Sequence, residues 1–464
     1  MDELRGRQKI IAQLVEARLK QGVSQAELAR RVGTQRSNIC RLEGGLQNPT
    51  LDMILKIASA LGKDVSLLLD DKEEPMSNIY SFRIYDTELM RFSMEKQGLS
   101  GLVAEILSTN GEQAHLLPLD MERTGEGVIR WLERRVIPKN RAFVDEILKT
   151  LGLSHNDTKG IIDVCKGLSL NDSYWIVQEG FEGKFSEYNL YENRFSEILA
   201  LVAYTGAGGS RQAFTTSPEL TTGGMLPKAW RYVEHDGIYL YKGGTTGASN
   251  AGREPYCEYY ASQIAETMGL NAVHYNLENW KGITASKCEL FTNIDTAYIP
   301  IGRIVRTGGI AACLAWYDNL GAEFSEQLRS MLVFDALIYN EDRHFGNFGV
   351  LRNNYSGKII APAPIFDNGL SLFCYAGKED YAHLDEYAKT RSNPYNISYE
   401  EVCAEVMGAK QKEQLRRMIG FRFKRHESLN LPEEHLQAIE KHLEGRVRKL
   451  LAIPTRRNKQ EKAR

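Results

Sequence analysis

The sequence lacks the cysteine pairs and long apolar runs that mark secreted, zinc-binding and membrane proteins. Its 464 residues include seven cysteines, and none of them lie close enough together to indicate a disulfide framework or a zinc site. The first residues are charged and no apolar run approaches about twenty residues, so neither a signal peptide nor a spanning helix is expected. These absences predict a protein of the reducing cytoplasm that does not enter the membrane.

A strong net charge is also absent, since the formal charge is only −2. The charge is unevenly distributed all the same. Residues 1–70 hold eleven basic and eight acidic side chains, and residues 409–464 hold sixteen basic and seven acidic ones. The middle of the chain therefore carries −14, which argues against nucleic acid or an anionic membrane as its partner. The length has room for about three domains.

Two short polar segments indicate phosphoryl transfer. Residues 340–349 read Asn-Glu-Asp-Arg-His-Phe-Gly-Asn-Phe-Gly, and residues 364–369 read Pro-Ile-Phe-Asp-Asn-Gly. Transfer from ATP needs a carboxylate that accepts the proton of the attacking hydroxyl, and an Asn and an Asp that hold Mg²⁺. Asp342, Asn347 and Asp367 supply these groups in the right order. A polar turn with an Asx cap is the alternative explanation of the first segment taken alone.

The segment upstream contains the remaining parts of a nucleotide site. A glycine-containing loop at 221–228 leads into two stretches with period-two patterning, which are separated by a turn at 235–237. Lys242 ends the second predicted strand, where its ammonium can reach phosphates under the loop. Glu258 is predicted to open an amphipathic helix that stops at Gly269. A strand lysine that pairs with a helix glutamate orders the nucleotide-binding lobe of protein kinases.

On these motifs, the chain from about 190 to 425 resembles the HipA-like serine/threonine kinases, bacterial enzymes best known as the toxin half of toxin–antitoxin pairs. The resemblance implies an α+β, two-lobed kinase fold that uses ATP and Mg²⁺. The residues that it implies are Asp342, Lys242 and Glu258 for catalysis, Asn347 and Asp367 for the metal, and Lys242, Gly223, Gly224 and Lys228 for the nucleotide.

The same resemblance implies regulation at the glycine-containing loop. Family members carry a hydroxyl residue there whose autophosphorylation ejects the loop and silences the kinase. Thr221 matches that position and Thr222 lies beside it, where the better-known relatives have Ser. The alternative is that both threonines only cap a turn.

The sequence pattern of residues 342–347 also occurs in phosphoinositide-type kinases. This motif therefore does not decide between a protein and a lipid substrate. The metal motif of those kinases is usually Asp-Phe-Gly, whereas this chain has Phe-Asp-Asn-Gly at 366–369. His344 is grouped with the catalytic residues because it is predicted to orient the loop or to neutralise developing charge. A satisfied packing histidine is the alternative, and we do not expect His344 to be the base.

The N-terminus has the pattern of a small helical domain. Residues 7–21 predict one amphipathic helix, and Ser24-Gln-Ala-Glu predicts a capping box that opens a second. Gly33 is expected to make the turn into a third helix over 34–43, and a fourth is expected over 51–61. The pattern predicts an all-α domain with a helix-turn-helix at its centre.

Over residues 6–69 this domain is similar to the Xre/Cro family of DNA-binding domains, which implies that the third helix enters the major groove. Ile39 and Leu42 are expected to face the core. Because the net charge of this part is modest, a homodimer on a two-fold operator is the expected binding unit. The side chains expected to face the groove are Gln35, Arg36, Ser37, Asn38 and Arg41. Of these, Arg36, Ser37 and Arg41 should approach base edges, and Gln25 and Asn38 should hold phosphates.

These patterns divide the chain into six parts. They are a helix-turn-helix domain (1–70), a linker (71–78), an N-terminal subdomain of the kinase (79–190), the core of the kinase N-lobe (191–280), the C-lobe with the catalytic and metal-binding loops (281–453), and a basic tail (454–464). The subdomain shows no recognisable chemistry, and we expect it to shape the substrate groove or the contact between domains.

Two functions remain open from the sequence. The first is an active kinase, dependent on ATP and Mg²⁺, that is joined to its own autorepressor-like domain; its partners would be operator DNA and a protein substrate, which in this family can be an aminoacyl-tRNA synthetase or another translation factor. The second is a transcription regulator whose kinase-like domain senses nucleotide or a partner. The site residues are all of chemically competent type, which favours the enzyme.

Overall fold

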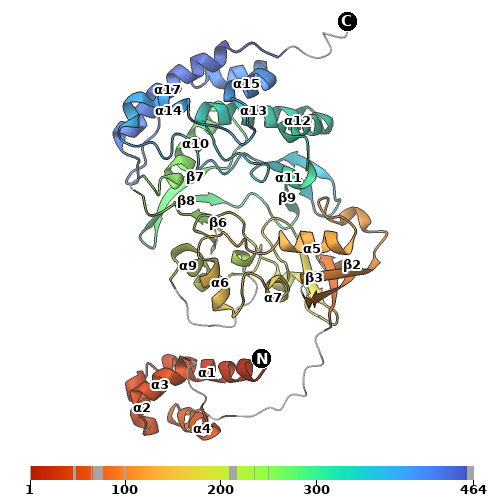
Figure 1. Cartoon of the computed structure of the whole chain (residues 1–464), viewed down its shortest axis with the longest axis vertical. Coiled ribbons are helices and arrows are strands. Elements are labelled where there is room, and N and C mark those ends of the chain that lie inside the picture. Colours follow the sequence, from red (N-terminus) through yellow and green to blue (C-terminus); the bar gives the residue numbers. More distant parts are fainter. Residues whose placement is uncertain are drawn as a thin grey trace. The chain divides into compact units, whose positions relative to one another are not determined.

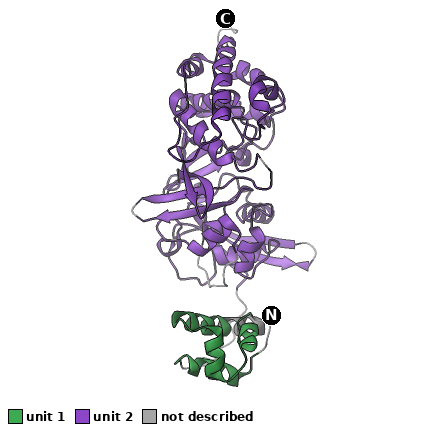
Figure 2. Ribbon diagram, turned by 90° about the vertical axis from the view of Figure 1, so that its left-hand side faces the viewer, with its two compact units in different colours: residues 1–76, 210–213 green, residues 77–209, 214–464 purple. Residues whose placement is uncertain are grey.

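The chain folds into two compact units (Figure 2). In this computed structural model the described residues up to 65 form the first unit, and those from Ser77 onward form the second. Most of the predicted linker, the turn residue at 235 and residues 457–464 of the predicted tail lie outside the described residues. The residues that the structure describes are 2–44, 49–63, 65, 77–98, 101–207, 217–234, 236–248 and 250–456.

The regular elements of the first unit, where it is described, are all helices. Its helices are α1 (Asp2–Lys20), α2 (Gln25–Val32), α3 (Arg36–Glu43) and α4 (Leu51–Ala60). Their apolar faces share one small core, in which Leu28, Ile39 and Ile57 are almost fully buried. The third helix begins two residues later than predicted, because Gln35 keeps an extended backbone. The first helix begins at Asp2 rather than at residue 7.

A side-chain hydrogen bond and one glycine set the two ends of α2. The Ser24 hydroxyl accepts a hydrogen bond from the backbone N–H of Glu27 at 3.1 Å, so the predicted cap is present. The predicted capping box is not closed, because the Glu27 carboxylate pairs instead with Arg30 at 2.7 Å and Arg31 at 2.9 Å. Gly33 ends α2 with a φ of +73°, a left-handed conformation that favours glycine.

The second unit begins with an antiparallel sheet of strand order β3-β2-β1-β4. Most buried side chains of this sheet form one core with those of the helices that lie between its third and fourth strands. The strands are β1 (Ile79–Ile84), β2 (Thr87–Gln97), β3 (Gly101–Thr109) and β4 (Tyr174–Gln178), and the helices are α5 (Gly125–Glu133), α6 (Val144–Thr150), α7 (Thr158–Cys165) and α8 (Phe185–Tyr188).

A second antiparallel sheet has the order β5-β6-β8-β7. Helix α9 contacts β5, and helix α10 contacts β7 and β8. The strand–turn–strand predicted upstream of Lys242 is confirmed, since β5 and β6 pair along their whole length. The elements are α9 (Glu197–Thr205), β5 (Lys228–Val233), β6 (Gly237–Lys242), α10 (Glu254–Met268), β7 (Tyr275–Trp280) and β8 (Ile283–Glu289).

The remainder of the unit is a short sheet, β11-β10-β9, and a group of helices. Helices α10, α13, α15, α16 and α17 supply the largest core of the chain, and Figure 1 shows α13, α15 and α17 gathered at one end of the unit. The elements are β9 (Thr296–Pro300), α11 (Ile301–Ile304), α12 (Gly309–Leu320), α13 (Ala322–Ile338), β10 (Gly349–Asn353), β11 (Ile359–Pro362), α14 (Leu384–Ala388), α15 (Tyr399–Val406), α16 (Ala409–Arg416) and α17 (Glu433–Ala452). Short 3₁₀ turns occur at Ala114–Leu116, Pro218–Leu220 and Asp380–His383.

The first sheet and its helices are anchored to strand β10 by one buried arginine. Arg352 is 1% exposed, and its guanidinium donates hydrogen bonds to the carbonyl oxygen of His115 at 2.7 Å and to the hydroxyl of Tyr174 at 2.5 Å. The region 79–190, to which the sequence assigned no chemistry, is thus hydrogen-bonded to strand β10, which follows Asn347.

The predicted fold class is confirmed, since a helical domain precedes an α+β region. Among the described helices, none has both the length and the apolar composition that a bilayer-spanning segment needs.

Candidate functional site

Three predicted site residues from separate elements meet at one point. Lys242 ends strand β6, and its Nζ lies 2.5 Å from Glu258 Oε1 and 2.5 Å from Asp367 Oδ1. Glu258 lies in the second turn of helix α10 and is 1% exposed. The prediction that Glu258 opens this helix is wrong, because Pro255 supplies the preformed first turn and the helix begins at Glu254.

The electrostatics of this cluster keep its charges in place. Burial alone would lower the pKa of Lys242, but the carboxylates of Asp367 and Glu258 raise it well above its ordinary value. Burial opposes the charge of Asp367 too, yet the ammonium groups of Lys242 and Lys228 hold its pKa well below the usual range. Asp367 is therefore an ionised carboxylate, and its side chain is about one-third exposed at 35%.

The loop that contains Asp342 and Asn347 connects helix α13 to strand β10. The backbone N–H of Asp342 donates to Asn340 Oδ1 at 3.0 Å, and Asn347 Nδ2 donates to the carbonyl oxygen of Asp342 at 3.0 Å. In the described part of the chain, no hydrogen bond or ion pair engages the Asp342 carboxylate itself. Burial raises the pKa of Asp342, as does the charge of Asp367, which makes this carboxylate a better proton acceptor than a solvated one.

Arg343 ties this loop to the segment that contains Asp367. Its side chain is fully buried and pairs with Asp335 at 3.0 Å. It also donates to the carbonyl oxygens of Asn347 and Phe366 and to Asn368 Oδ1. One guanidinium therefore fixes the spacing between the two predicted metal-binding segments. Sequence reasoning missed this role, although the single acid in the apolar run 331–338 of α13 is a signal that a buried cation lies nearby.

The backbone around Asp367 is held in an unusual conformation. Its φ is +59°, which is uncommon for a residue other than glycine. Its N–H donates to the hydroxyl of Tyr275 at 3.1 Å, and the N–H of Asn368 donates to Glu258 Oε2 at 3.0 Å. Glu258 therefore binds Lys242 with one oxygen and the residue after Asp367 with the other.

The glycine-containing loop places the two predicted phosphorylation candidates at its base. The Thr221 hydroxyl donates to the carbonyl oxygen of Leu168 at 2.9 Å, and the Thr222 hydroxyl donates to that of Pro218 at 2.6 Å. Thr221 is buried and Thr222 is partly so, whereas the glycines of the loop are exposed. Both hydroxyls thus make turn contacts in this conformation.

Lys228 lies under this loop. It is paired in register with Lys242 across β5 and β6, and it is only 8% exposed. A Cβ atom placed on Gly224 would come within 2.1 Å of Lys228 Nζ, so the ammonium rests directly against the glycine. Burial and the charge of Lys242 lower the pKa of Lys228 to about 7. Lys228 thus lies beside Lys242, between the loop and the strand that ends there.

His344 shapes the loop from outside. Its side chain is exposed, and its Nδ1 accepts a hydrogen bond from the backbone N–H of Gly346 at 3.0 Å. The charge of a protonated imidazole here would lower the pKa of Asp342. The contact agrees with an orienting role and leaves Asp342 as the base candidate.

The predicted metal residues offer the hard oxygen ligands that Mg²⁺ prefers. The amide nitrogen of Asn347 is engaged by the Asp342 carbonyl, which directs its Oδ1 away from that contact. Asp367 contributes an ionised oxygen. By the chemistry of their oxygens, these two residues would suit a magnesium ion.

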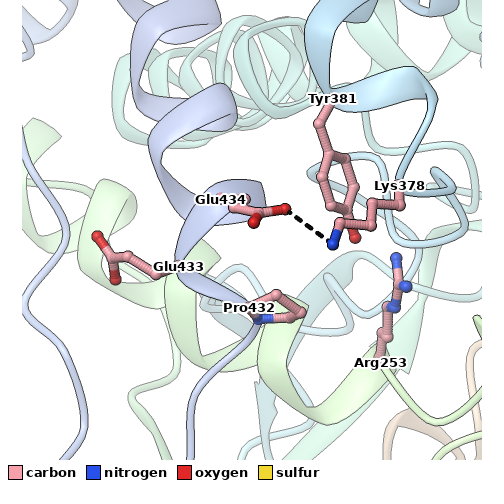
Figure 3. A pocket seen from close by; sticks show the side chains of 6 residues that line it. All are labelled: Arg253, Lys378, Tyr381, Pro432, Glu433 and Glu434. Atoms are coloured by element: carbon pink, nitrogen blue, oxygen red, sulfur yellow. Dashed lines mark ion pairs between the residues drawn. The ribbon is translucent and has the colours of Figure 1, made fainter.

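A separate hollow of about 350 Å³ lies beside the N-terminal ends of α10 and α17 (Figure 3). Lys378 and Glu434 pair across it at 3.5 Å, and the ring of Tyr381 stacks on the buried ring of His435. Figure 3 labels its lining residues, Arg253, Lys378, Tyr381, Pro432, Glu433 and Glu434. None of the predicted site residues lines this hollow, so it is distinct from the nucleotide candidates.

In the first unit, helix α3 presents the predicted DNA-facing side chains. Ile39 and Leu42 are buried, as predicted. Arg41 Nη2 donates to Asn38 Oδ1 at 2.9 Å, and Asn38 Nδ2 donates to Thr34 Oγ1 at 3.0 Å. The side chains that are exposed are Gln35, Arg36, Ser37 and Arg41.

The position of α3 is fixed by an ion pair with α1. Arg18 Nε lies 2.6 Å from Glu43 Oε1, and both side chains are about nine-tenths buried. Gln25 Nε2 donates to the same carboxylate at 2.8 Å, so this phosphate candidate is held at the start of α2 rather than extended into solvent. The helix α3 is therefore held in place by buried contacts and carries four exposed polar side chains, of which Arg41 is hydrogen-bonded to Asn38.

Comparison with known proteins gives two kinds of relative. The family described as Helix-turn-helix matches residues 14–68. An uncharacterised HTH-type transcriptional regulator of Archaeoglobus fulgidus is 40% identical over 60 residues, which are 12% of this chain and 86% of that protein. Another from Haemophilus influenzae is 36% identical over 59 residues, and this chain spans only 60% of its length.

Among solved structures, the proinflammatory kinase CtkA of Helicobacter pylori is similar at 20% identity, over 51% of this chain and 93% of that one, with a TM-score of 0.42. A chain of the Shewanella oneidensis MR-1 toxin–antitoxin complex of HipA, HipB and operator DNA is similar at 12% identity, over 83% of this chain and 93% of that one, with a TM-score of 0.46. This chain belongs to the helix-turn-helix family through its first unit, which is formed by helices α1 to α4.

Proposed function

We propose that the second unit is a serine/threonine protein kinase that uses ATP and Mg²⁺, and that the first unit is a DNA-binding domain of the autorepressor type. One observation carries the kinase proposal. Lys242, Glu258 and Asp367 form a single ion cluster, and the guanidinium of Arg343 joins this cluster to the loop that holds Asp342 and Asn347.

Each of these residues has a part in phosphoryl transfer. Lys242, held by Glu258, would bind phosphate oxygens, and Asn347 and Asp367 would hold the magnesium ion, which would neutralise phosphate charge when bound. Asp342 has no competing hydrogen bond among the described residues, so its carboxylate can orient the attacking hydroxyl and accept its proton. Asp367 Oδ1 contacts Lys242 Nζ directly, so the carboxylate that would hold the metal lies beside the ammonium that would bind the phosphates.

A protein hydroxyl is the better substrate candidate than an inositol lipid. The acidic middle of the chain disfavours an anionic membrane surface, and a DNA-binding domain on the same polypeptide fits a regulator of the cell interior. The family resemblance would make an aminoacyl-tRNA synthetase or another translation factor the acceptor, and a loop threonine, Thr221 or Thr222, the site of autophosphorylation.

Phosphate transfer from γ-labelled MgATP tests this proposal. The wild type should label itself or an added protein, and Asp342→Asn should lose about a hundredfold or more of the rate, the usual contribution of a positioned base. Asp52→Asn, an exposed change on helix α4 of the other unit, is the matched control and should leave the rate unchanged. An inert wild type that still binds nucleotide would favour the alternative of a nucleotide-sensing regulator. Label that survives Asp342→Asn would exclude Asp342 as the base.

The DNA-binding proposal rests on the exposed polar face of α3 and needs its own test. A homodimer on a two-fold operator is proposed, because a single domain with so modest a charge offers few phosphate contacts. In a gel shift at moderate salt, the full-length protein should prefer DNA from upstream of its own gene over random DNA. Equal retardation of both would count against sequence recognition.

A further inference from the structure

The segment between α5 and α6, residues 137–142, runs alongside the glycine-containing loop. The backbone N–H of Ile137 donates to the carbonyl oxygen of Leu220 at 2.8 Å, and that of Ala142 donates to the carbonyl oxygen of Met225 at 2.8 Å. These two hydrogen bonds attach the loop to residues 137–142. Those residues belong to the region 79–190, to which the sequence assigned no chemistry.

Arg141, within this segment, binds the backbone of the loop through its side chain. It is 2% exposed, and its Nη1 donates to the carbonyl oxygens of Glu219 at 2.9 Å and Thr222 at 3.0 Å. Its Nη2 donates to the carbonyl oxygen of Lys228 at 2.9 Å. One guanidinium therefore holds the backbone at both ends of the stretch that carries the two exposed glycines.

Glu219 completes this contact from the opposite side. Its carboxylate forms a buried ion pair with Arg141 and also accepts the N–H of Trp230 at 2.8 Å in strand β5. The loop is thus fixed to the strand as well as to the segment 137–142. Neither Arg141 nor Glu219 contacts Lys242 or Asp367 among the described residues, and the hydrogen bond from Arg141 to Lys228 is to its backbone carbonyl oxygen, so both residues would act on the nucleotide site through the position of the loop.

We propose that Arg141 is a positioning residue for nucleotide binding. It pins both ends of the loop 222–228, so that the backbone amides of the loop and Lys228 are in place before the phosphates arrive. The same pinning keeps the hydroxyls of Thr221 and Thr222 in their turn contacts, and release of Arg141 frees the loop to move outward. This inference rests on the proposed nucleotide site but assigns its preorganisation to residues 137–142.

Two variants separate positioning from folding. Arg141→Lys keeps the charge, but a single ammonium cannot serve three carbonyl oxygens and a carboxylate in a fixed fork. Arg141→Met combined with Glu219→Gln removes both charges, so that no unpaired buried charge is left to unfold the protein. Arg134→Met, at an exposed arginine at the end of α5, is the matched control.

MgATP affinity is measured by calorimetry on the full chain, without relying on turnover. Arg141→Lys and the double variant should each bind MgATP about tenfold or more weakly than the wild type. Both variants lose charge-assisted hydrogen bonds that hold the loop in place, and such bonds are stronger than neutral ones. In the kinase assay KM for ATP should rise with little change in kcat. Hydrogen exchange should quicken at the amides of 220–228 and stay unchanged across β1, β2 and α13, whereas a merely structural role would speed exchange throughout.

The failures of the two proposals are distinguishable. A wild type that does not bind MgATP overturns the nucleotide site and this inference with it. A wild type that binds, together with variants that bind equally well or exchange faster everywhere, overturns the positioning role alone. Arg134→Met must match the wild type in both readouts; a loss of affinity there equal to that of Arg141→Lys would also count against a specific clamp.

Discussion

The lysine under the glycine-containing loop should make nucleotide binding depend on pH. Lys228 has a pKa lowered to about 7, because it is buried beside Lys242. Bound phosphates favour the charged amine, so the complex should hold a proton that the free protein has lost. The charged groups that face this amine are Lys242, Asp367, Arg141 and Glu258. Of these, Lys242 keeps its proton and Asp367 stays ionised on either side of neutral pH.

The size of the effect follows from the free-state pKa. Below pH 7 the amine is charged before binding and affinity is insensitive to pH. Above pH 7 each unit costs up to tenfold in affinity, so that Kd for MgATP should rise about 15-fold between pH 7 and pH 8.5. At pH 8.5 binding should take up about one proton per nucleotide.

Calorimetry in buffers of different ionisation enthalpy measures both quantities. Lys228→Arg is the informative variant, because a guanidinium stays charged throughout this range. It should bind with nearly constant affinity from pH 7 to 8.5 and without the extra proton, while Lys228→Met should bind weakly at every pH. The ratio of wild type to Lys228→Arg cancels the titration of the nucleotide itself. A wild type and a Lys228→Arg protein with the same pH profile would refute the assignment of the proton to Lys228.

Three other changes have expected outcomes. Arg343→Met should lower the free energy of unfolding of the second unit by about 3–5 kcal/mol, because it leaves Asp335 buried without its ion-pair partner. Urea unfolding measures this loss, and a value below about 1 kcal/mol would mean that the surroundings of Asp335 relax freely. Gly33→Ala should cost the first unit about 1 kcal/mol, purely from its left-handed backbone, since an added Cβ meets no atom within 4 Å; thermal unfolding of the two units would reveal it. Arg41→Ala should cost about 1–3 kcal/mol of operator binding and relax specificity at one base pair, whereas Gln25→Ala should weaken all sequences alike; quantitative gel shifts distinguish the two.

The order of the elements around the candidate site could be predicted because the chemistry itself constrains it. Lys242, Glu258 and Asp367 are far apart in the sequence, yet each lies in a short motif with a strand, helix or loop signature, and the structure brings them to one point. The α3 face could be predicted for a similar reason, since helical periodicity separates Ile39 and Leu42 from the polar residues between them. The roles of these residues in catalysis and in DNA binding remain predictions.

What could not be predicted depends on contacts between distant segments. Arg343 is visible within its motif, but its four partners are on three different segments and no periodicity links them. Arg141 meets the loop across about eighty residues of sequence, where a buried arginine reads like any other polar residue of a helical region. The start of α10 was misplaced because Glu258 has the signature of a helix start, whereas Pro255 sets the actual one.

The buried anchor at Arg352 has a consequence for how nucleotide would leave the site. One body, built on β1 to β4, holds strand β10 through Arg352 and holds the glycine-containing loop through Arg141. Separation of strand β10 from the glycine-containing loop would break one of these buried contacts. A local movement of the exposed residues Gly223 and Gly224 would break neither. We therefore expect ADP release to be timed by the local opening of this tip, and the turnover rate to follow the flexibility of a few loop residues instead of the rotation of whole lobes.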